Sequence, residues 1–327
     1  MESQCTKIRD KLFTVAKCLH WSLTAAAVFG FVGWHYYTYV FKLCLQTIKN
    51  PYQRTIYLVI VNVLSVMIVW CFLMTSLTPP GKIPQEFHVD RDDATDILQG
   101  YYNEAGRQKF LHSLARRLPI VTRTFSGGIA YCARCQVIKP DRAHHCSTCS
   151  RCILKMDHHC YCVNNCISFT NYKFFFLFVL YYFLYSAFVS ATTLRPFVSY
   201  WKEDDPSWDD FQFLLLFLLS NIIALNMAGF IVFHTFLMST NRTTLEIFRP
   251  PVLVATGLDR RAFNLGYLKN FYEVFGDRWY LWLIPVSSGK GDGIHFELRR
   301  RDEESEPLLT RGPDRPNVEA RHPTGSS

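Results

Sequence analysis

Four long stretches of the chain lack charged residues and are rich in Leu, Val, Ile and Phe. They cover residues 18–41, 55–81, 174–194 and 211–241. An α-helix rises about 1.5 Å per residue, so roughly 20 apolar residues cross a bilayer core of about 30 Å. The pattern therefore predicts an all-α polytopic membrane protein with four transmembrane helices, at 18–41, 55–78, 173–195 and 211–239. A soluble globular protein is excluded. The first stretch is too long for a secretory signal peptide, and no small-residue cleavage site follows it.

The distribution of Lys and Arg indicates how these helices are oriented. Four crossings place the first 17 residues, the segment 78–173 and everything after residue 241 on one side. Thirty of the 35 Lys and Arg residues lie there, and the positive-inside rule assigns that side to the cytosol. Both termini are therefore expected in the cytosol. The net charge of +8 suits contact with anionic lipid, and no recognition motif predicts nucleic acid as a partner.

The polar segments divide the rest of the chain. Residues 1–17 are a cytosolic N-terminus, and 79–131 form a linker that leads to a Cys-rich domain at 132–172, between the second and third helices. Residues 240–298 form a C-terminal region, in which Leu268, Phe271, Tyr272 and Phe275 make an apolar stripe at helical spacing. We expect this stripe to dock on the protein or to lie in the membrane interface. Residues 299–327 are rich in Arg, Glu, Pro, Gly and Ser, which predicts disorder.

The Cys-rich domain contains an internal repeat. The pattern Cys132-x2-Cys135-x9-His145-x6-Cys152 recurs 14 residues later as Cys146-x2-Cys149-x9-His159-x6-Cys166. Disulfides are disfavoured in the reducing cytosol, whereas three thiolates and one imidazole form a closed tetrahedral zinc site. The repeat therefore predicts two interleaved structural zinc ions. A module with so small an apolar core depends on metal for folding, at about 10–16 kcal/mol per zinc in small finger peptides.

Two thiols of the domain lie outside the repeat. A third copy would begin at Cys160, but Val163 occupies the position of its partner, so Cys160 has no metal. Asp157 and His158 precede it, and a carboxylate, an imidazole and a thiol are the parts of a base-activated nucleophile. In such a site His158 takes the proton of Cys160 and Asp157 orients His158. The alternative is that Asp157 and His158 only support the zinc ligands. Cys162 is interpreted as a small buried side chain.

The short distance between the Cys-rich domain and the third predicted helix limits the substrates that Cys160 could meet. Lys173, at the start of the third predicted helix, follows Cys166 by seven residues, a reach of at most about 25 Å. The Cys160 thiol is therefore expected near the bilayer surface. A nucleophile there meets a lipid chain on one side and a cytosolic protein on the other, which suits acyl transfer through a thioester.

The segment from Tyr131 to Lys173, with Met-Asp-His-His-Cys at 156–160, resembles the Asp-His-His-Cys (DHHC) protein S-acyltransferases. The resemblance extends to Thr243-Thr244-Leu245-Glu246, which matches the Thr-Thr-x-Glu motif of that family, and to Asn270 of its C-terminal motif. It implies a protein-cysteine S-palmitoyltransferase. Such an enzyme takes a fatty acyl group from acyl-CoA, usually palmitoyl-CoA, as a thioester on Cys160 and transfers it to cysteines of membrane-associated proteins. The Golgi is the family's commonest location, with endosome and plasma membrane as alternatives.

The resemblance also implies substrate contacts. The helices of the family enclose a cavity for the acyl chain, and the matching positions here are His35, Phe175, Phe178 and Tyr185. Their alternative role is ordinary helix packing or lipid contact. Basic residues within the zinc module that could meet the phosphates of coenzyme A are Lys139, Arg142 and Lys155, unless they simply form a solvated basic face.

Two departures from the family pattern carry their own expectations. Cys160-Tyr161-Cys162 replaces the usual Cys-Pro-Trp, and the second thiol could accept the acyl group from the first. His35 stands where relatives often carry a small residue, so we expect a shorter pocket and a preference for chains of about sixteen carbons or fewer. Two other functions stay open at this point: a membrane-anchored cross-braced zinc ubiquitin ligase, which needs no free thiol, and a catalytically silent scaffold.

Overall fold

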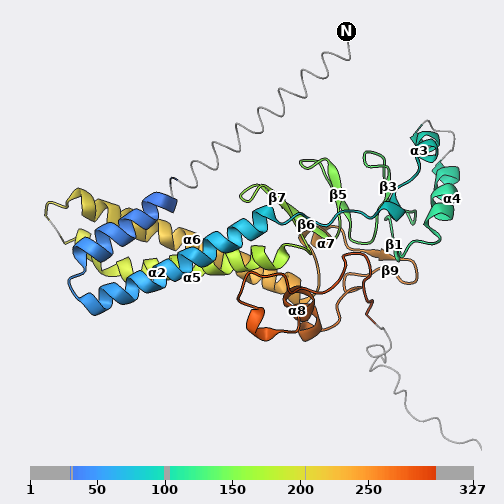
Figure 1. Cartoon of the computed structure of the whole chain (residues 1–327). Helices are drawn as coiled ribbons and strands as arrows, with labels where there is room; N and C mark the ends of the chain where they lie inside the picture. The colour runs from blue at the N-terminus through green and yellow to red at the C-terminus, as the bar shows by residue number, and fades with distance from the viewer. Residues whose placement is uncertain (1–29, 31, 99–103, 203, 300–327) are drawn as a thin grey trace, which may run out of the picture.

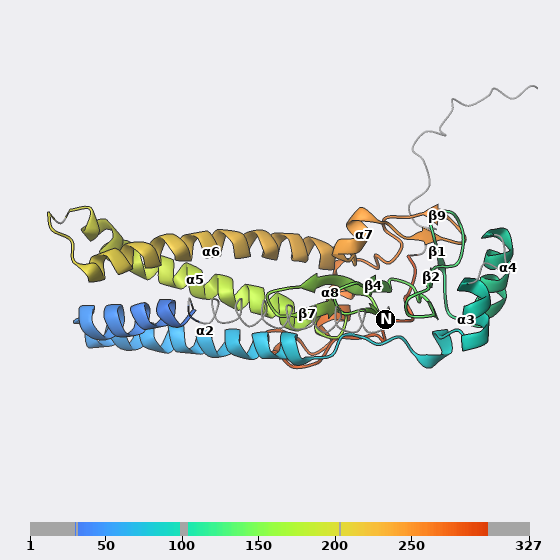
Figure 2. The same cartoon turned by 90° about the horizontal axis from the view of Figure 1, so that it is seen from above.

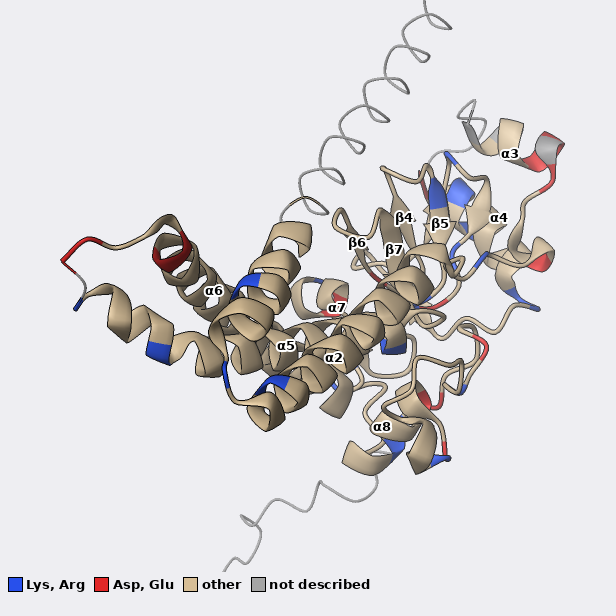
Figure 3. Cartoon of the chain, turned by 60° about the vertical axis from the view of Figure 1, so that its left-hand side comes forward, with Lys and Arg blue, Asp and Glu red and all other residues tan. Residues whose placement is uncertain are grey.

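Three long helices form an elongated bundle that leads into a strand-rich module at one end (Figure 1). The structure, a computed structural model, describes residues 30, 32–98, 104–202 and 204–299. The long helices are α2 (Pro51–Leu77), α5 (Tyr172–Tyr200) and α6 (Trp208–Ser239). Each is long and apolar enough to cross a membrane, and α5 packs along both of the others. Their middle turns carry almost no charged residues, as the tan ribbons of Figure 3 show.

The first predicted span, 18–41, lies largely outside the described residues. Residues 32–37 are helical and continue into the π-helix η1 (Thr38–Thr47). Tyr39 and Leu43 of η1 are buried in a cluster with α2, α5 and α6. The described part of the chain thus has three candidate membrane helices where the sequence predicts four. Residues 1–17 and 300–327, the predicted N-terminal segment and nearly all of the predicted disordered tail, also lie outside the described residues.

Local sequence sets the ends of the long helices. Pro51 occupies the first turn of α2, and the side chain of Asn50 accepts hydrogen bonds from the N–H groups of Tyr52 and Gln53. The helix stops at Leu77 because Pro79 and Pro80 cannot continue it. A capping box between Ser207 and Asp210 starts α6.

The Cys-rich domain consists of three successive antiparallel hairpins. They pair β2 (Tyr131–Cys132) with β3 (Val137–Ile138), β4 (His144–Cys146) with β5 (Arg151–Ile153), and β6 (Met156–Cys160) with β7 (Asn165–Ser168). Each turn contains one residue in the left-handed region: Gln136 at φ 53°, Ser150 at φ 52° and Asn164 at φ 48°. These three positions are 14 residues apart, so the backbone repeats once more than the metal-ligand pattern does.

Side chains of the third hairpin attach the domain to the membrane end of α2. Asn165 donates from Nδ2 to the carbonyl oxygens of Thr75 (3.0 Å) and Thr78 (2.9 Å), at the helix end where carbonyl groups have no partner within the helix. Asn171 also donates to Thr75 (3.2 Å). Since Asn165 pairs with Cys160 across the hairpin, the Cys160 backbone is held at the end of the bundle.

The remaining elements surround the hairpins (Figure 2). The linker contains η2 (Gln85–Phe87), α3 (Arg91–Leu98) and α4 (Glu104–Ala115). The C-terminal region contains α7 (Thr244–Phe248), β8 (Val252–Leu253), β9 (Gly257–Leu258), α8 (Tyr267–Phe275) and η3 (Trp279–Leu281), and β8 pairs with both β9 and the linker strand β1 (Thr122–Arg123). In the apolar stripe of α8, Phe271 and Phe275 pack against the core formed with α5 and α6, whereas Leu268 is exposed. The stripe therefore docks on the protein through Phe271 and Phe275.

Candidate active site and metal centres

Each predicted set of four zinc ligands lies together in space. The ligand atoms of Cys132, Cys135, His145 and Cys152 all lie within 4.8 Å of one another, and so do those of Cys146, Cys149, His159 and Cys166. The first two hairpins supply Cys-x2-Cys turns, and each set takes its His and last Cys from the next hairpin along the chain. The two clusters are therefore interleaved in the fold.

Donor distances test whether these residues suit zinc. The His145 Nδ1 atom lies 3.5, 3.2 and 3.9 Å from the sulfur atoms of Cys132, Cys135 and Cys152. In the other cluster, His159 Nδ1 lies 3.6, 3.4 and 3.5 Å from the sulfurs of Cys146, Cys149 and Cys166. A tetrahedron with Zn–S near 2.3 Å and Zn–N near 2.0 Å has S···N edges of about 3.5 Å. Both clusters fit a tetrahedral ion bound through Nδ1, which would lock the hairpins together.

The third hairpin holds Cys160 at the position that a first metal ligand occupies in the other two. Successive side chains of β6 point to opposite faces, so His159 faces the second metal cluster while His158 and Cys160 share the other face. Cys160 is half-buried and packs against an apolar cluster that includes Cys71, Phe175 and Met238, from three different long helices. The thiol is thus located between the metal domain and the helix bundle.

Asp157 and His158 are in direct contact. His158 Nδ1 lies 2.7 Å from Asp157 Oδ2, and the ring of His158 lies edge-on to Phe175, with centroids 5.2 Å apart. The Asp157 carboxylate also accepts hydrogen bonds from the N–H and the hydroxyl of Thr244, both at 2.8 Å. Burial raises the pKa of Asp157, but the His158 and Thr244 contacts outweigh it, so the pKa lies below its usual range. An ionised Asp157 favours the tautomer of His158 whose Nε2 can take a proton.

The thiols of Cys160 and Cys162 influence each other. Contact with the Cys162 side chain, together with burial, raises the pKa of Cys160, whereas contact with Cys160 lowers the pKa of Cys162. Backbone N–H groups of Val163 and Cys162 oppose the rise at Cys160. Cys162 is exposed, contrary to its interpretation as a buried side chain.

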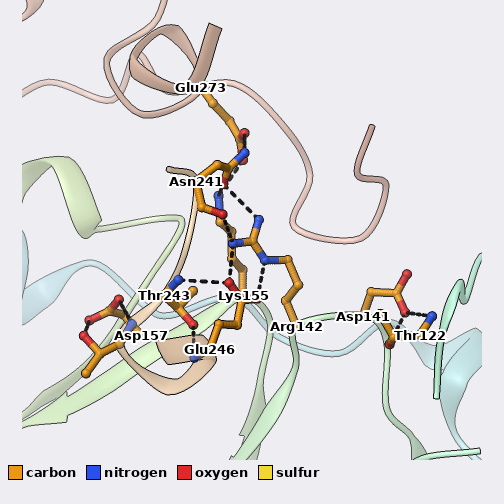
Figure 4. Close-up of polar contacts among 10 residues, drawn as sticks. Thr122, Asp141, Arg142, Lys155, Asp157, Asn241, Thr243, Glu246 and Glu273 are labelled. Atoms are coloured by element: carbon orange, nitrogen blue, oxygen red, sulfur yellow. Dashed lines mark hydrogen bonds and ion pairs between the residues drawn. The ribbon is translucent and has the colours of Figure 1, made fainter. Parts of the chain in front are cut away.

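The Thr-Thr-x-Glu segment forms a second polar centre behind the hairpins (Figure 4). Thr243 and Glu246 make a capping box at the start of α7. Glu246 also binds Arg142 through two hydrogen bonds, Nε to Oε1 at 2.6 Å and Nη2 to Oε2 at 2.8 Å, and the side chains are 1% and 5% exposed. The guanidinium of Arg142 lies 4.4 Å from the ring centroid of Phe263. Arg142 is therefore engaged inside the protein.

The other two basic candidates have different surroundings. Lys155 pairs with Glu273 of α8, and its side chain is 13% exposed. It also lines a pocket of about 400 Å³ together with Lys269 and Lys290. Lys139 is half-buried beside the first metal cluster. Among the three, Arg142 is the least accessible to a ligand.

The four acyl-chain candidates occur at two levels of the bundle. Phe175 and Phe178 belong to the apolar cluster that packs against Cys160. Tyr185 and His35 lie together, with Tyr185 Oη 3.3 Å from His35 Nδ1, and His35 Nε2 lies 2.8 Å from Ser220 Oγ. These contacts join the helical segment 32–37 to α5 and α6. Both His35 and Tyr185 are buried.

Comparison with known proteins agrees with this architecture. Residues 126–250 match the family model described as DHHC palmitoyltransferase. Palmitoyltransferase ZDHHC2 of Danio rerio is 40% identical over 288 residues, which cover 88% of this chain and 79% of that protein. Palmitoyltransferase ZDHHC15 of Homo sapiens is 40% identical over 282 residues, covering 85% and 82%. This chain belongs to the DHHC palmitoyltransferase family.

Family membership settles the class of activity. The chain is a protein S-palmitoyltransferase and an integral membrane protein, with two Cys/His clusters that could each hold a metal ion. The zinc ubiquitin ligase is set aside, because the homologous proteins are palmitoyltransferases over most of the chain.

Two residues of the candidate site, Asn241 and His234, were not candidates in the sequence. Asn241 accepts from Arg142 Nη1 at 3.0 Å and donates to Glu273 at 2.6 Å, and thereby links the hairpins to α8. His234 of α6 bonds Tyr172 (2.9 Å), and its ring centroid lies 6.1 Å from that of His158. A single imidazole in an apolar helix was the only sequence signal for His234. Asn270, which the sequence did single out through the C-terminal motif, donates to the Ser239 carbonyl at 2.7 Å and so holds α8 to the end of α6.

Proposed function

We propose that Cys160 is the nucleophile of this palmitoyltransferase and that it works by a two-step route. His158 takes the proton of Cys160, and the thiolate attacks the thioester carbonyl of acyl-CoA. The acyl–sulfur bond to coenzyme A breaks, and His158 returns the proton to the leaving thiol. In the second step His158 takes the proton of a protein cysteine, whose thiolate attacks the acyl-enzyme. The bond between the acyl carbon and the Cys160 sulfur breaks, and His158 returns the proton to Cys160. Asp157 orients His158 and stabilises its charged form.

One observation carries this proposal. Asp157 and His158, in contact at 2.7 Å, lie at the same end of the helix bundle as Cys160. Among the described thiols outside the metal clusters, only Cys160 packs on the apolar cluster around Phe175 and is also half-exposed. That combination offers a base, an orienting carboxylate, a thiol and an apolar surface for an acyl chain. The acceptors are cysteines of membrane-associated proteins that reach the cytosolic face.

Structural zinc is the metal that the two clusters suit. Each set has four protein donors, three of them thiolates, with no position left for substrate. The ions would stabilise the hairpins that carry Asp157, His158 and Cys160, without a chemical step of their own.

The substrate contacts follow from the same arrangement. Phe175 and Phe178 are proposed to flank the acyl chain near the thiol, and the His35–Tyr185 contact is proposed to close the far end. A closed end favours chains of about sixteen carbons or fewer. For the coenzyme A phosphates we retain Lys139 and Lys155, since Arg142 already binds a carboxylate.

The proposed membrane topology is based on the sequence. The charge-free stretch 18–41, whose last four residues belong to η1, would supply a fourth span, and the excess of Lys and Arg favours a cytosolic location for both termini. The Golgi is the proposed location, with endosome or plasma membrane as alternatives.

Labelling of the purified protein tests the proposed nucleophile. Wild-type protein incubated with labelled palmitoyl-CoA should acquire a hydroxylamine-labile label, which Cys160→Ala should abolish. Cys44→Ala is the matched control, because it removes a buried thiol in η1 far along the chain from the site, and it should retain the label. A label that persists in Cys160→Ala would assign the nucleophile elsewhere. An unlabelled wild-type protein would favour the scaffold.

A further inference from the structure

The turn that follows Cys160 has the geometry of a metal-binding turn but carries a different second thiol. In the first two hairpins the second Cys is the fourth residue of the turn, at Cys135 and Cys149, and the next residue is left-handed. In the third hairpin the fourth residue is Val163, which is buried, and the left-handed residue is Asn164. The additional thiol, Cys162, occupies the third position.

Position three of this turn faces outward. Its counterpart in the first hairpin, Arg134, is exposed, and Cys162 is exposed as well. Cys160, by contrast, is half-buried against the apolar cluster of the helices. The two thiols nevertheless belong to one tight turn, which is closed by the hydrogen bond from the N–H of Asn164 to the carbonyl oxygen of Tyr161 at 3.3 Å, and they are only two residues apart. One thiol thus faces the bundle, and its neighbour faces the solvent.

We propose that Cys162 is a second acyl acceptor, through which the acyl group passes from Cys160 to the protein substrate. This relay rests on the proposed role of Cys160. The Cys162 sulfur attacks the carbonyl carbon of the Cys160 thioester, the bond between that carbon and the Cys160 sulfur breaks, and the proton of Cys162 ends on Cys160. The reactants and the products each comprise one thiol and one thioester, so the step needs no oxidant or other co-reactant.

Proximity and exposure explain what the second thiol contributes. Exchange between neighbouring groups is intramolecular, and well-oriented intramolecular reactions reach effective molarities of about 10⁵–10⁸ M. The carbonyl carbon then moves from a thiol packed on the helices to one that a cytosolic protein can approach. Protein substrates meet the acyl group outside the bundle, while Cys160 is free to accept the next one.

The experiment measures where the acyl group is and how fast it leaves. Full-length protein is loaded with labelled palmitoyl-CoA for one turnover, quenched in acid and capped at its free thiols. Fragment ions of the peptide 156–173 then assign the label to residue 160 or 162. In parallel, loaded enzyme is mixed with a cysteine-containing peptide anchored in vesicles, and the rate of transfer is measured.

The relay predicts a label on both cysteines of the wild-type protein and none on Cys160→Ala. Cys162→Ala should still load Cys160 but should transfer the acyl group at least about tenfold more slowly than the wild type does. Arg134→Ala, at the equivalent position of the first hairpin, should transfer normally. Cys162→Ser, which keeps the size of the side chain, should behave as Cys162→Ala does and guards against a folding effect of the smaller residue.

Both observations are required. A wild-type label on Cys160 alone, or transfer by Cys162→Ala at the wild-type rate, overturns the relay and leaves the nucleophile assignment intact. A label on Cys162 in Cys160→Ala overturns that assignment as well, because Cys162 would then react with acyl-CoA directly.

Discussion

The Arg142–Glu246 ion pair provides the sharpest test of how the hairpins are attached to the C-terminal region. The sequence predicts Arg142 as a coenzyme A contact, whereas the structure buries it against Glu246, with side chains 1% and 5% exposed. Substitution by Met keeps the length of the side chain and removes its charge. In Arg142→Met the Glu246 carboxylate retains the N–H of Thr243 at 2.9 Å but loses both guanidinium contacts.

The expected cost is large because a buried charge is left without its partner. Breaking a buried ion pair by removing one side chain costs about 3–5 kcal/mol. If each kcal/mol lowers the Tm by about 2–4 °C, Arg142→Met should melt roughly 6–20 °C below the wild type. The double variant Arg142→Met/Glu246→Met should lose less than the sum of the two single variants, because no unpaired charge remains.

The assay is thermal unfolding of the purified protein in one detergent, together with the KM for palmitoyl-CoA. Arg134→Met is the matched control: the same substitution at an exposed position of the same domain should change stability by no more than about 0.5 kcal/mol. The reasoning is refuted if Arg142→Met keeps the wild-type Tm and instead raises the KM for palmitoyl-CoA. That result would return Arg142 to the role that the sequence suggested.

Three further outcomes are expected. Cys149→Ser should lower the zinc content from two ions per chain to one or none and abolish acyl loading, as measured by metal analysis and labelling; an unchanged zinc content would contradict the assigned ligand set. Thr244→Val removes the hydroxyl that donates to Asp157 at 2.8 Å, a charge-assisted bond of about 1.5–3 kcal/mol. It should slow acyl loading by about 10- to 100-fold at unchanged zinc content, and loading at the normal rate would show that the bond does not matter for His158. His35→Ala should open the end of the acyl site and raise the use of eighteen-carbon over fourteen-carbon acyl-CoA in a competition assay; a wild-type enzyme that already prefers eighteen carbons would argue against a closing role for His35.

Regular patterns in the sequence predicted the long helices and the metal-ligand sets of this protein. Apolar stretches long enough for a bilayer predicted the helices that the structure has as α2, α5 and α6. The 14-residue spacing of Cys and His predicted which eight side chains gather into two clusters. Both kinds of pattern are local, because a helix rises by a constant amount per residue and a metal site needs a short list of donor types.

Contacts between distant segments were decided only by the tertiary structure. Arg142 meets Glu246 across 104 positions, and Thr244 meets Asp157 across 87. No periodicity links such pairs, so sequence alone recognised Arg142 as a cation but not what it would bind. The orientation of a thiol also depends on the folded structure. The sequence predicted a buried Cys162, but the fold of its turn leaves this side chain exposed. Composition and spacing thus determined the membrane helices and the two sets of metal ligands. The packing of α7 and α8 on the hairpins determined which charged side chains are paired in the interior of the protein and which remain available to a substrate.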